Sequence, residues 1–261
     1  MQKRIIFFDI DETLVNSRTH QVPLSTQRAL SALHQCGHTL CISTGRSLST
    51  SGMYGIPAAI KEFPWDGYVC CNGQFVFNHE KEPLLQRFLN TQSVFELCSL
   101  CQALGCCLEL KTPSFTYFTA EPDPNAEHAY RFFGLPLHPV QEYAGEPVMS
   151  AMIFGPVGWD YAPFQHIPGL QIIPGRSTYA DVGITGISKA TGNRFLTRQY
   201  GFSNYIAFGD SQNDVEMLQE AQPGIAMGAC EPSAQKAADT ITDSVEENGI
   251  WNACIRLKLI F

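Results

Sequence analysis

The sequence predicts an α/β protein with a doubly wound, mostly parallel, Rossmann-like core sheet and an inserted α+β domain. The first observation is a run of four large apolar residues, 5–8, that ends directly at an aspartate and is typical of a buried parallel strand. The second is a strand–helix–strand rhythm in residues 1–82 that resumes in residues 182–261. The third is a break in this rhythm over residues 83–181, where most of the prolines lie. We therefore predict a core formed by the two outer segments and a cap formed by the insert.

The first part of the core follows this pattern closely. Residues 4–9 predict a strand, and a helix is expected to open at Leu24 with Ser25 as its N-cap and to stop at Gly37. Residues 39–43 predict a second buried strand, which ends at Thr44. Because a right-handed crossover makes the two strands parallel, their polar ends should meet at one edge of the sheet.

The next stretch predicts a hairpin and then the insert. Residues 67–71 form a third apolar run, and Asn72-Gly73 between this run and residues 74–77 is a turn signal. In the insert, residues 91–104 have helical apolar spacing and are followed by Gly105. Short strands are expected at residues 107–110, 115–118, 149–154 and 170–173.

The final part of the chain returns to the core pattern. A helix is predicted at residues 190–199, directly after Lys189, and a buried strand at residues 205–208 leads to Asp210. The remaining expected elements are a helix that begins at Val215, a strand at 224–228, and closing helices at 232–238 and 246–257.

Composition excludes several classes of protein. The chain has 261 residues and a formal net charge of −8, and no cluster of Lys and Arg suggests a nucleic-acid surface. No apolar stretch approaches the roughly 18 residues of a membrane span, so neither nucleic acid nor a membrane is an expected partner. The ten cysteines are expected to be free thiols in a cytoplasmic protein, and Cys98-x-x-Cys101 lacks the second pair that a zinc site needs. We expect a monomer or a weak homodimer.

Polar side chains follow several of the predicted strands. Asp9 and Asp11 lie one residue apart at the end of the first strand, where open α/β sheets bind ligands. A lone Asp-x-Asp is often just a turn, but two adjacent carboxylates repel and favour a cation, and carboxylate oxygens suit Mg²⁺. Carboxylates, a cation and hydroxyl donors together are what phosphoryl chemistry needs. Such groups recur at the other predicted strand and helix ends: Thr44, Gly45, Lys189, Asp210, Asn213 and Asp214.

These motifs, in this order, resemble those of the haloacid dehalogenase-like phosphatases. The motifs are Asp9-Ile10-Asp11-Glu12-Thr13, Thr44, Lys189 and Gly209-Asp210-Ser211-Gln212-Asn213-Asp214. The Cof-type branch, which carries an α/β (type IIB) cap, is similar in further positions: Thr44-Gly45-Arg46, Asn72-Gly73, Ser188-Lys189-Ala190-Thr191-Gly192 and the inserted 83–181 segment. One departure is Glu12, which stands where the branch commonly has glycine.

The resemblance implies distinct roles for the acidic residues. Asp9 corresponds to the nucleophile that forms an aspartyl-phosphate, and Asp11 corresponds to the general acid–base. The metal would be held by Asp9, by the backbone carbonyl of Asp11 and by Asp210. Asp214 would orient a metal-bound water or Lys189.

The remaining positions would bind the phosphoryl group. Thr44 and the Gly45 amide would donate hydrogen bonds to it, Lys189 would offset its charge, and Asn213 would contact the substrate or support the residues that do. Arg46 could pair with a carboxylate or reach the substrate, and we leave it outside the catalytic set.

The sequence thus predicts an Mg²⁺-dependent phosphatase, a phosphoric monoester hydrolase, acting on a small phosphorylated metabolite such as a sugar phosphate. Two alternatives stay open: a phosphomutase of the same superfamily and a non-catalytic phospholigand-binding protein. A serine esterase is excluded as a reading of Gly209-Asp210-Ser211, because no histidine follows His166.

Overall fold

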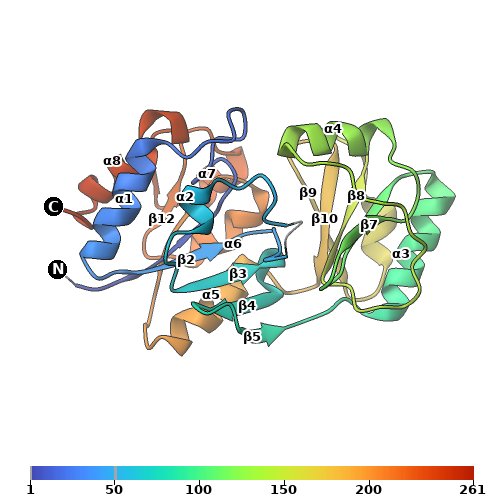
Figure 1. Cartoon of the computed structure of the whole chain (residues 1–261), viewed down its shortest axis with the longest axis horizontal. Helices are drawn as coiled ribbons and strands as arrows, with labels where there is room; N and C mark the ends of the chain where they lie inside the picture. The colour runs from blue at the N-terminus through green and yellow to red at the C-terminus, as the bar shows by residue number, and fades with distance from the viewer. Residues whose placement is uncertain (1, 50–51) are drawn as a thin grey trace. The chain divides into compact units, whose positions relative to one another are not determined.

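The computed structural model of the chain describes residues 2–49 and 52–261. The chain divides into two compact units (Figure 1). The first comprises Met1–Arg46, Ile56–Leu85 and Ser188–Phe261, and the second comprises Ser47–Gly55 and Gln86–Ile187. The predicted insert ran from 83 to 181, whereas the second unit also takes in the short segment after Arg46.

The first unit is built on a sheet in which, within the described residues, eight strands follow the order β13-β12-β11-β1-β2-β3-β4-β5. The pairs from β13 to β3 are parallel, and β3 and β4 form an antiparallel hairpin. All four side chains of β1 are fully buried, as expected for a central strand covered on both faces. The fold class predicted from the sequence is therefore confirmed. The strands are β1 (Ile5–Phe8), β2 (Thr39–Ser43), β3 (Gly67–Cys70), β4 (Phe75–Asn78), β5 (Pro83–Gln86), β11 (Ile206–Gly209), β12 (Gly224–Ala226) and β13 (Thr240–Ile241).

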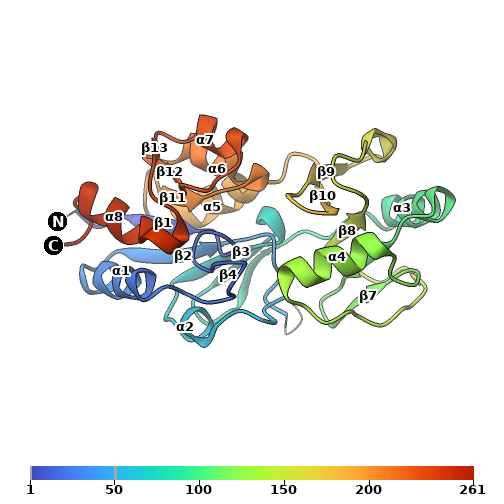
Figure 2. The same ribbon diagram turned by 90° about the horizontal axis from the view of Figure 1, so that it is seen from above.

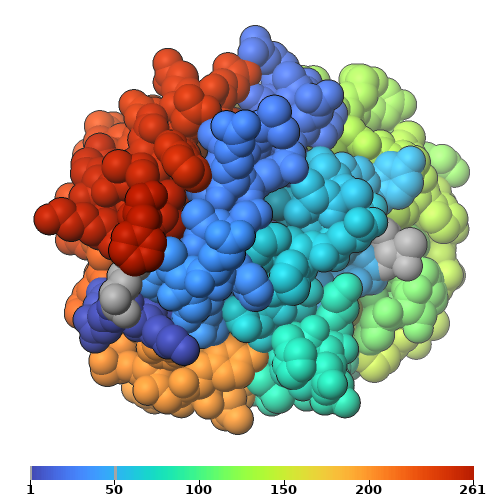
Figure 3. All heavy atoms as spheres, turned by 60° about the vertical axis from the view of Figure 1, so that its left-hand side comes forward, coloured from blue at the N-terminus to red at the C-terminus, as the bar shows by residue number. Residues whose placement is uncertain are grey.

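Helices cover both faces of this sheet, as Figure 2 shows. On one side α5, α6 and α7 pack in succession, and on the other α1 packs against α8. Figure 3 shows α1 and α8, in blue and red, side by side on the surface, so segments from the two ends of the chain close the same layer. The helices of the unit are α1 (Leu24–Gln35), α2 (Ala58–Lys61), α5 (Lys189–Gln199), α6 (Val215–Glu220), α7 (Pro232–Ala237) and α8 (Gly249–Arg256), with 3₁₀ turns at Cys71–Gly73, Gln212–Asp214 and Val245–Glu247.

The second unit contains an antiparallel sheet with the order β7-β6-β8-β10-β9. Side chains alternate across it: Ala151 and Ile153 pack in the cluster that contains α3, whereas Met152 and Phe154 pack in the cluster that contains α4. The two helices therefore cover opposite faces. The elements are α3 (Thr91–Leu104), β6 (Leu108–Lys111), β7 (Thr116–Phe118), α4 (Pro124–Phe133), β8 (Ser150–Phe154), a 3₁₀ turn (Ala162–His166), β9 (Leu170–Pro174) and β10 (Tyr179–Ile184).

Some local predictions were wrong. Ser25 is not an N-cap, because α1 already begins at Leu24 after Pro23, and the Ser25 hydroxyl is buried without a hydrogen-bond partner. The closing helix predicted over 246–257 is interrupted at Asn248, whose left-handed φ of 64° separates a 3₁₀ turn from α8. The strands β5, β10 and β13 and the helix α4 were not predicted.

No helix in residues 2–49 and 52–261 combines the length and the apolar character that a bilayer crossing requires.

Candidate active site

Three strand ends of the first unit carry the predicted site. Asp9 follows β1, and its backbone N–H still donates to the Phe208 carbonyl of β11 at 3.0 Å. Thr44 follows β2 and donates in the same way to Val69 of β3 at 2.8 Å, while Asp210 follows β11. Because β1 lies between β2 and β11 and all three are parallel, these residues meet at the carboxyl edge of the sheet, where its winding reverses direction.

Lys189 is the first residue of α5 and is completely buried. Its Nζ donates to Asp9 Oδ1 at 2.6 Å and to Asp214 Oδ1 at 2.7 Å. The helix start is held close to the β3–β4 hairpin: Gly73 has a φ of +95°, and a Cβ there would lie 2.0 Å from the Ser188 carbonyl oxygen. Only glycine therefore fits at this turn, and the close approach fixes the position from which Lys189 reaches the aspartates.

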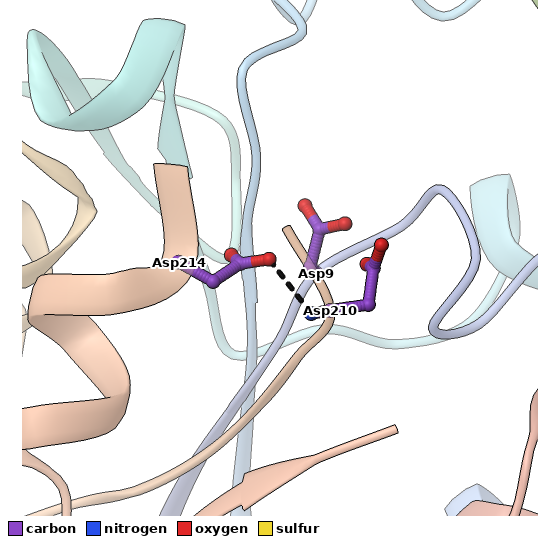
Figure 4. A group of neighbouring side chains, drawn as sticks. All are labelled: Asp9, Asp210 and Asp214. Atoms are coloured by element: carbon purple, nitrogen blue, oxygen red, sulfur yellow. Dashed lines mark hydrogen bonds between the residues drawn. The ribbon is translucent and has the colours of Figure 1, made fainter. Parts of the chain in front are cut away.

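Asp214 organises the loop after β11. Its Oδ2 accepts hydrogen bonds from the backbone N–H groups of Asp210 at 2.9 Å and Ser211 at 3.0 Å, the first of which is drawn in Figure 4. The carboxylate packs on Gly209, where a Cβ would lie 2.6 Å from the Asp214 Cγ. Since Lys189 binds the other oxygen, this geometry favours the predicted supporting role for Asp214.

Three carboxylates converge at this edge. An oxygen from each of Asp9, Asp210 and Asp214 lies within 4.8 Å of the others, and all three residues are buried (Figure 4). Within the described residues, the Lys189 ammonium pairs with the Asp9 and Asp214 carboxylates of this group. Close buried carboxylates need further positive charge, and oxygen donors of this kind fit a hard divalent cation such as Mg²⁺.

The same crowding sets the protonation of the group. Burial, followed by the Asp214 and Asp11 carboxylates, raises the pKa of Asp9 to about 7, although Lys189 acts to lower it. Burial alone would lower the pKa of Lys189, but the two aspartates outweigh it and raise that pKa. Lys189 is therefore held as a cation, whereas Asp9 depends on added positive charge to stay ionised at neutral pH.

Asp11 lies apart from this group and pairs with Arg46. The guanidinium donates two hydrogen bonds to the carboxylate, from Nε to Oδ2 and from Nη2 to Oδ1, both at 2.8 Å. Burial raises the pKa of Asp11, but Arg46 outweighs burial, and the pKa lies below its ordinary value. The sequence left open whether Arg46 pairs with a carboxylate or reaches the substrate, and the described geometry shows the first.

The turn that directly follows Asp11 explains why the branch commonly has glycine at position 12. Glu12 has a φ of 60°, a left-handed conformation in which glycine is favoured over other residues. Its Oε1 accepts a hydrogen bond from the Ser17 backbone N–H at 3.1 Å. This contact anchors a side chain where glycine would have none, and it offsets part of the backbone strain.

Other residues support the strand ends. Thr13, which we had quoted only as part of a motif, is fully buried and donates to Asp210 Oδ1 at 3.1 Å. Asn213 donates from Nδ2 to Asn72 Oδ1 at 3.0 Å. The Asn72 N–H in turn donates to the Thr44 carbonyl at 3.1 Å. The structure thus places Asn213 against the hairpin turn.

Two of the predicted phosphate ligands, Thr44 and Gly45, lie at the end of β2. The Thr44 hydroxyl accepts a hydrogen bond from the Arg46 N–H at 3.2 Å, and Gly45 between them is partly exposed. Of the supporting residues, Thr13 and Asn72 were recognisable only from their motifs. No local pattern could have indicated the partner of Arg46, because it lies 35 residues away along the chain.

Comparison with known proteins identifies the family of the chain. The haloacid dehalogenase-like hydrolase family matches residues 6–254. YkrA of Bacillus subtilis, provisionally named a phosphatase, is 26% identical over 100% of both chains. A Streptococcus pyogenes protein, provisionally named a bifunctional phosphatase and peptidyl-prolyl cis-trans isomerase, is 29% identical over 98% of this chain, which spans 54% of that protein's length.

A solved structure extends the match to the fold. The subclass IIB sugar phosphatase BT4131 has a TM-score of 0.88 and 26% identity, and the alignment covers 99% of this chain and 100% of that one. The predicted resemblance is confirmed, and the names of these relatives agree with the prediction of a phosphatase. The chain belongs to the haloacid dehalogenase-like hydrolase family.

Proposed function

We propose that this chain is an Mg²⁺-dependent phosphatase that hydrolyses a small phosphorylated metabolite through an aspartyl-phosphate on Asp9. The observation that carries the proposal is the buried group formed by Asp9, Lys189, Asp210 and Asp214 at the edge where the sheet reverses its winding. A phosphoryl group is anionic, so it requires positive charge, which Lys189 and a cation held by the carboxylates would supply.

The two aspartates of the first motif would divide the chemistry. In the first step the Asp9 carboxylate attacks phosphorus, and the ester oxygen leaves with a proton from Asp11. In the second step Asp11 takes a proton from water as the water oxygen attacks phosphorus, which releases inorganic phosphate and restores Asp9. The two-point contact with Arg46 favours ionised Asp11, the form that accepts a proton in the second step, so Asp11 would have to gain a proton before the first step.

Other groups of the site would bind rather than react. Lys189 holds Asp9 in place and would offset charge on the phosphoryl oxygens, while the Thr44 hydroxyl and the Gly45 amide would donate to those oxygens. Asn213 would support this arrangement through its contact with Asn72.

The metal would be held by the Asp9 and Asp210 carboxylates and by the backbone carbonyl of Asp11, with Asp214 as support. When bound, Mg²⁺ would supply positive charge beside the phosphoryl oxygens.

The substrate class rests on the relatives. The sugar phosphatase BT4131 resembles this chain along its whole length, which supports a sugar phosphate or a similar small phosphomonoester. We propose that the inserted segment selects among such substrates. The cytoplasmic location and the monomeric or weakly dimeric state stay predictions.

The test is a panel of phosphorylated metabolites incubated with the purified chain and Mg²⁺, with inorganic phosphate as the readout. Release that disappears on chelation and in the Asp9→Asn variant would support the proposal. A phosphorylated product without free phosphate would indicate a phosphomutase, and binding without turnover of any panel member would indicate a phospholigand-binding protein.

A further inference from the structure

The end of α3 in the second unit brings two cysteines together. The helix ends at Leu104, and Gly105 adopts a left-handed φ of 67°. The Cys106 N–H then reaches back to the Cys101 carbonyl at 3.1 Å, and the Gly105 N–H reaches the Gln102 carbonyl at 3.3 Å. This is the Schellman arrangement, in which the side chains of the first and last residues commonly pack against each other.

In this chain both of those residues are cysteines. The Cys106 thiol donates a hydrogen bond to the Cys101 carbonyl oxygen at 3.6 Å. Both side chains pack in the apolar cluster between α3 and its sheet. The backbone closure and the contact of the Cys106 thiol with Cys101 hold the two residues side by side, as a disulfide between them requires.

The two thiols differ in a way that suits a reactive pair. The interaction with Cys101 lowers the pKa of Cys106, which is half-buried, whereas the same interaction and burial raise the pKa of the buried Cys101. A thiolate is the form that reacts with oxidants, so Cys106 should react first and Cys101 second.

The neighbouring cysteines lack these features. Burial raises the pKa of Cys98 to about 11 and the pKa of Cys107 to about 12. Cys107 also packs on the opposite face of the sheet, with α4, so its side chain points away from Cys101.

We propose that Cys101 and Cys106 are a modification site at which hydrogen peroxide forms a reversible intrachain disulfide. The Cys106 thiolate attacks one peroxide oxygen, the O–O bond breaks, and hydroxide leaves, which gives a sulfenic acid. The Cys101 sulfur then attacks the Cys106 sulfur, the S–O bond breaks, and water leaves with the Cys101 proton. The two thiols lose two electrons in total, and one peroxide becomes two waters. The bond would lock the end of α3 to the start of β6.

The test uses the full chain treated with hydrogen peroxide, blocked with iodoacetamide and digested with trypsin. All four cysteines of this region fall in one peptide, residues 88–111. We expect this peptide to lose two hydrogens and to take up two alkyl groups instead of four, and dithiothreitol before blocking should restore all four. Fragmentation should give no backbone fragments within residues 101–106 of the oxidised peptide.

Variants locate the bond. Cys98→Ser and Cys107→Ser should still lose two hydrogens, whereas Cys101→Ser and Cys106→Ser should not. Circular dichroism checks that each variant is folded. Because fragmentation maps the bond in the unaltered chain, the test holds even if Cys101→Ser fails to fold. Four alkylated cysteines after peroxide, or a bond mapped to Cys98 or Cys107, would overturn the proposal.

Discussion

Each unit of the protein buries a carboxylate, and the two units neutralise it differently. In the first unit Asp9 shares the Lys189 ammonium with Asp214, and Asp210 lies beside them. In the second unit Glu109 on β6 accepts a hydrogen bond from the Tyr130 hydroxyl of α4. The second oxygen of Glu109 faces the Lys111 ammonium at 3.4 Å.

The difference lies in the balance of charge. Glu109 is one carboxylate facing one ammonium and one hydroxyl, a set that can persist in a protein interior as part of the fold. The Tyr130 hydroxyl stays neutral and can donate to Glu109, because burial, followed by the Glu109 carboxylate, raises the pKa of Tyr130. The first centre gathers three carboxylates around one ammonium, which favours an added cation. We infer that the clustering of several carboxylates, rather than burial of an acid, distinguishes the proposed reactive centre in the first unit from the Glu109 centre in the second.

The largest expected effect is loss of activity in Asp9→Asn. The amide has the shape of the carboxylate but is not a nucleophile, so phosphate release from p-nitrophenyl phosphate should fall by about 10³-fold or more. The fold should survive, because Lys189 keeps its bond to Asp214. The matched control is Asp66→Asn at the opposite end of the strands, where the carboxylate accepts a hydrogen bond from the Leu40 N–H at 2.7 Å. Equal losses in the two variants would contradict the assignment of Asp9.

The second effect is stabilisation by Mg²⁺. If the first centre binds the cation only when folded, a concentration 100 times the dissociation constant should stabilise the protein by about 2.7 kcal/mol. Thermal unfolding with and without Mg²⁺ measures this, and Asp210→Asn should weaken the gain. A gain that is unchanged in Asp210→Asn would place the cation elsewhere.

The third effect concerns the contact between Arg46 and Asp11. Lysine keeps the charge but cannot make the two-point contact, so Arg46→Lys should lower kcat by about 10-fold to 100-fold, the kinetic equivalent of a charged hydrogen bond. Arg18→Lys is the control, because Arg18 pairs with Glu246 on the surface and its side chain is 79% exposed. If both variants kept full kcat, the contact would have no part in catalysis.

The smallest expected effect concerns the Glu109 centre of the second unit, which comprises Glu109, Tyr130 and Lys111. Tyr130→Phe removes the hydroxyl that donates a hydrogen bond to the buried Glu109. This loss should lower the free energy of unfolding by about 1–3 kcal/mol. Tyr143→Phe should cost less, since that hydroxyl donates to a carbonyl at 3.2 Å in a partly exposed position. Both variants should keep the stabilisation by Mg²⁺. Loss of that stabilisation in Tyr130→Phe would break the distinction between the centres.

The two units also differ in how much could be predicted. In the first unit the buried runs and their polar ends indicated the strands, and β2 has the predicted bounds of Thr39–Ser43. Sequence order was enough to bring Asp9, Lys189 and Asp210 to one edge, because parallel strands share their carboxyl ends.

The second unit depends more on long-range pairing. The helix α3 was predicted with its bounds of Thr91–Leu104, since apolar spacing and Gly105 are local signals. The helix α4 was not predicted, although Asp123 caps it and Pro124 opens it. The strand β10 was not predicted either, because it is defined by its pairing with β8 and β9. Likewise, the two-point contact of Arg46 with Asp11 depends on tertiary packing that no local pattern encodes.

The most direct test of the central claim is to locate the phosphoryl group on the protein. The Asp11→Asn variant should still form the aspartyl-phosphate from ³²P-labelled p-nitrophenyl phosphate, because p-nitrophenolate leaves without a proton. Hydrolysis of this aspartyl-phosphate should be slow, because the variant lacks the base that activates water. We predict a burst of p-nitrophenolate and an acid-quenched protein whose label maps to the peptide with Asp9. Label on another residue, or a protein with neither burst nor label while phosphate is released, would contradict the account.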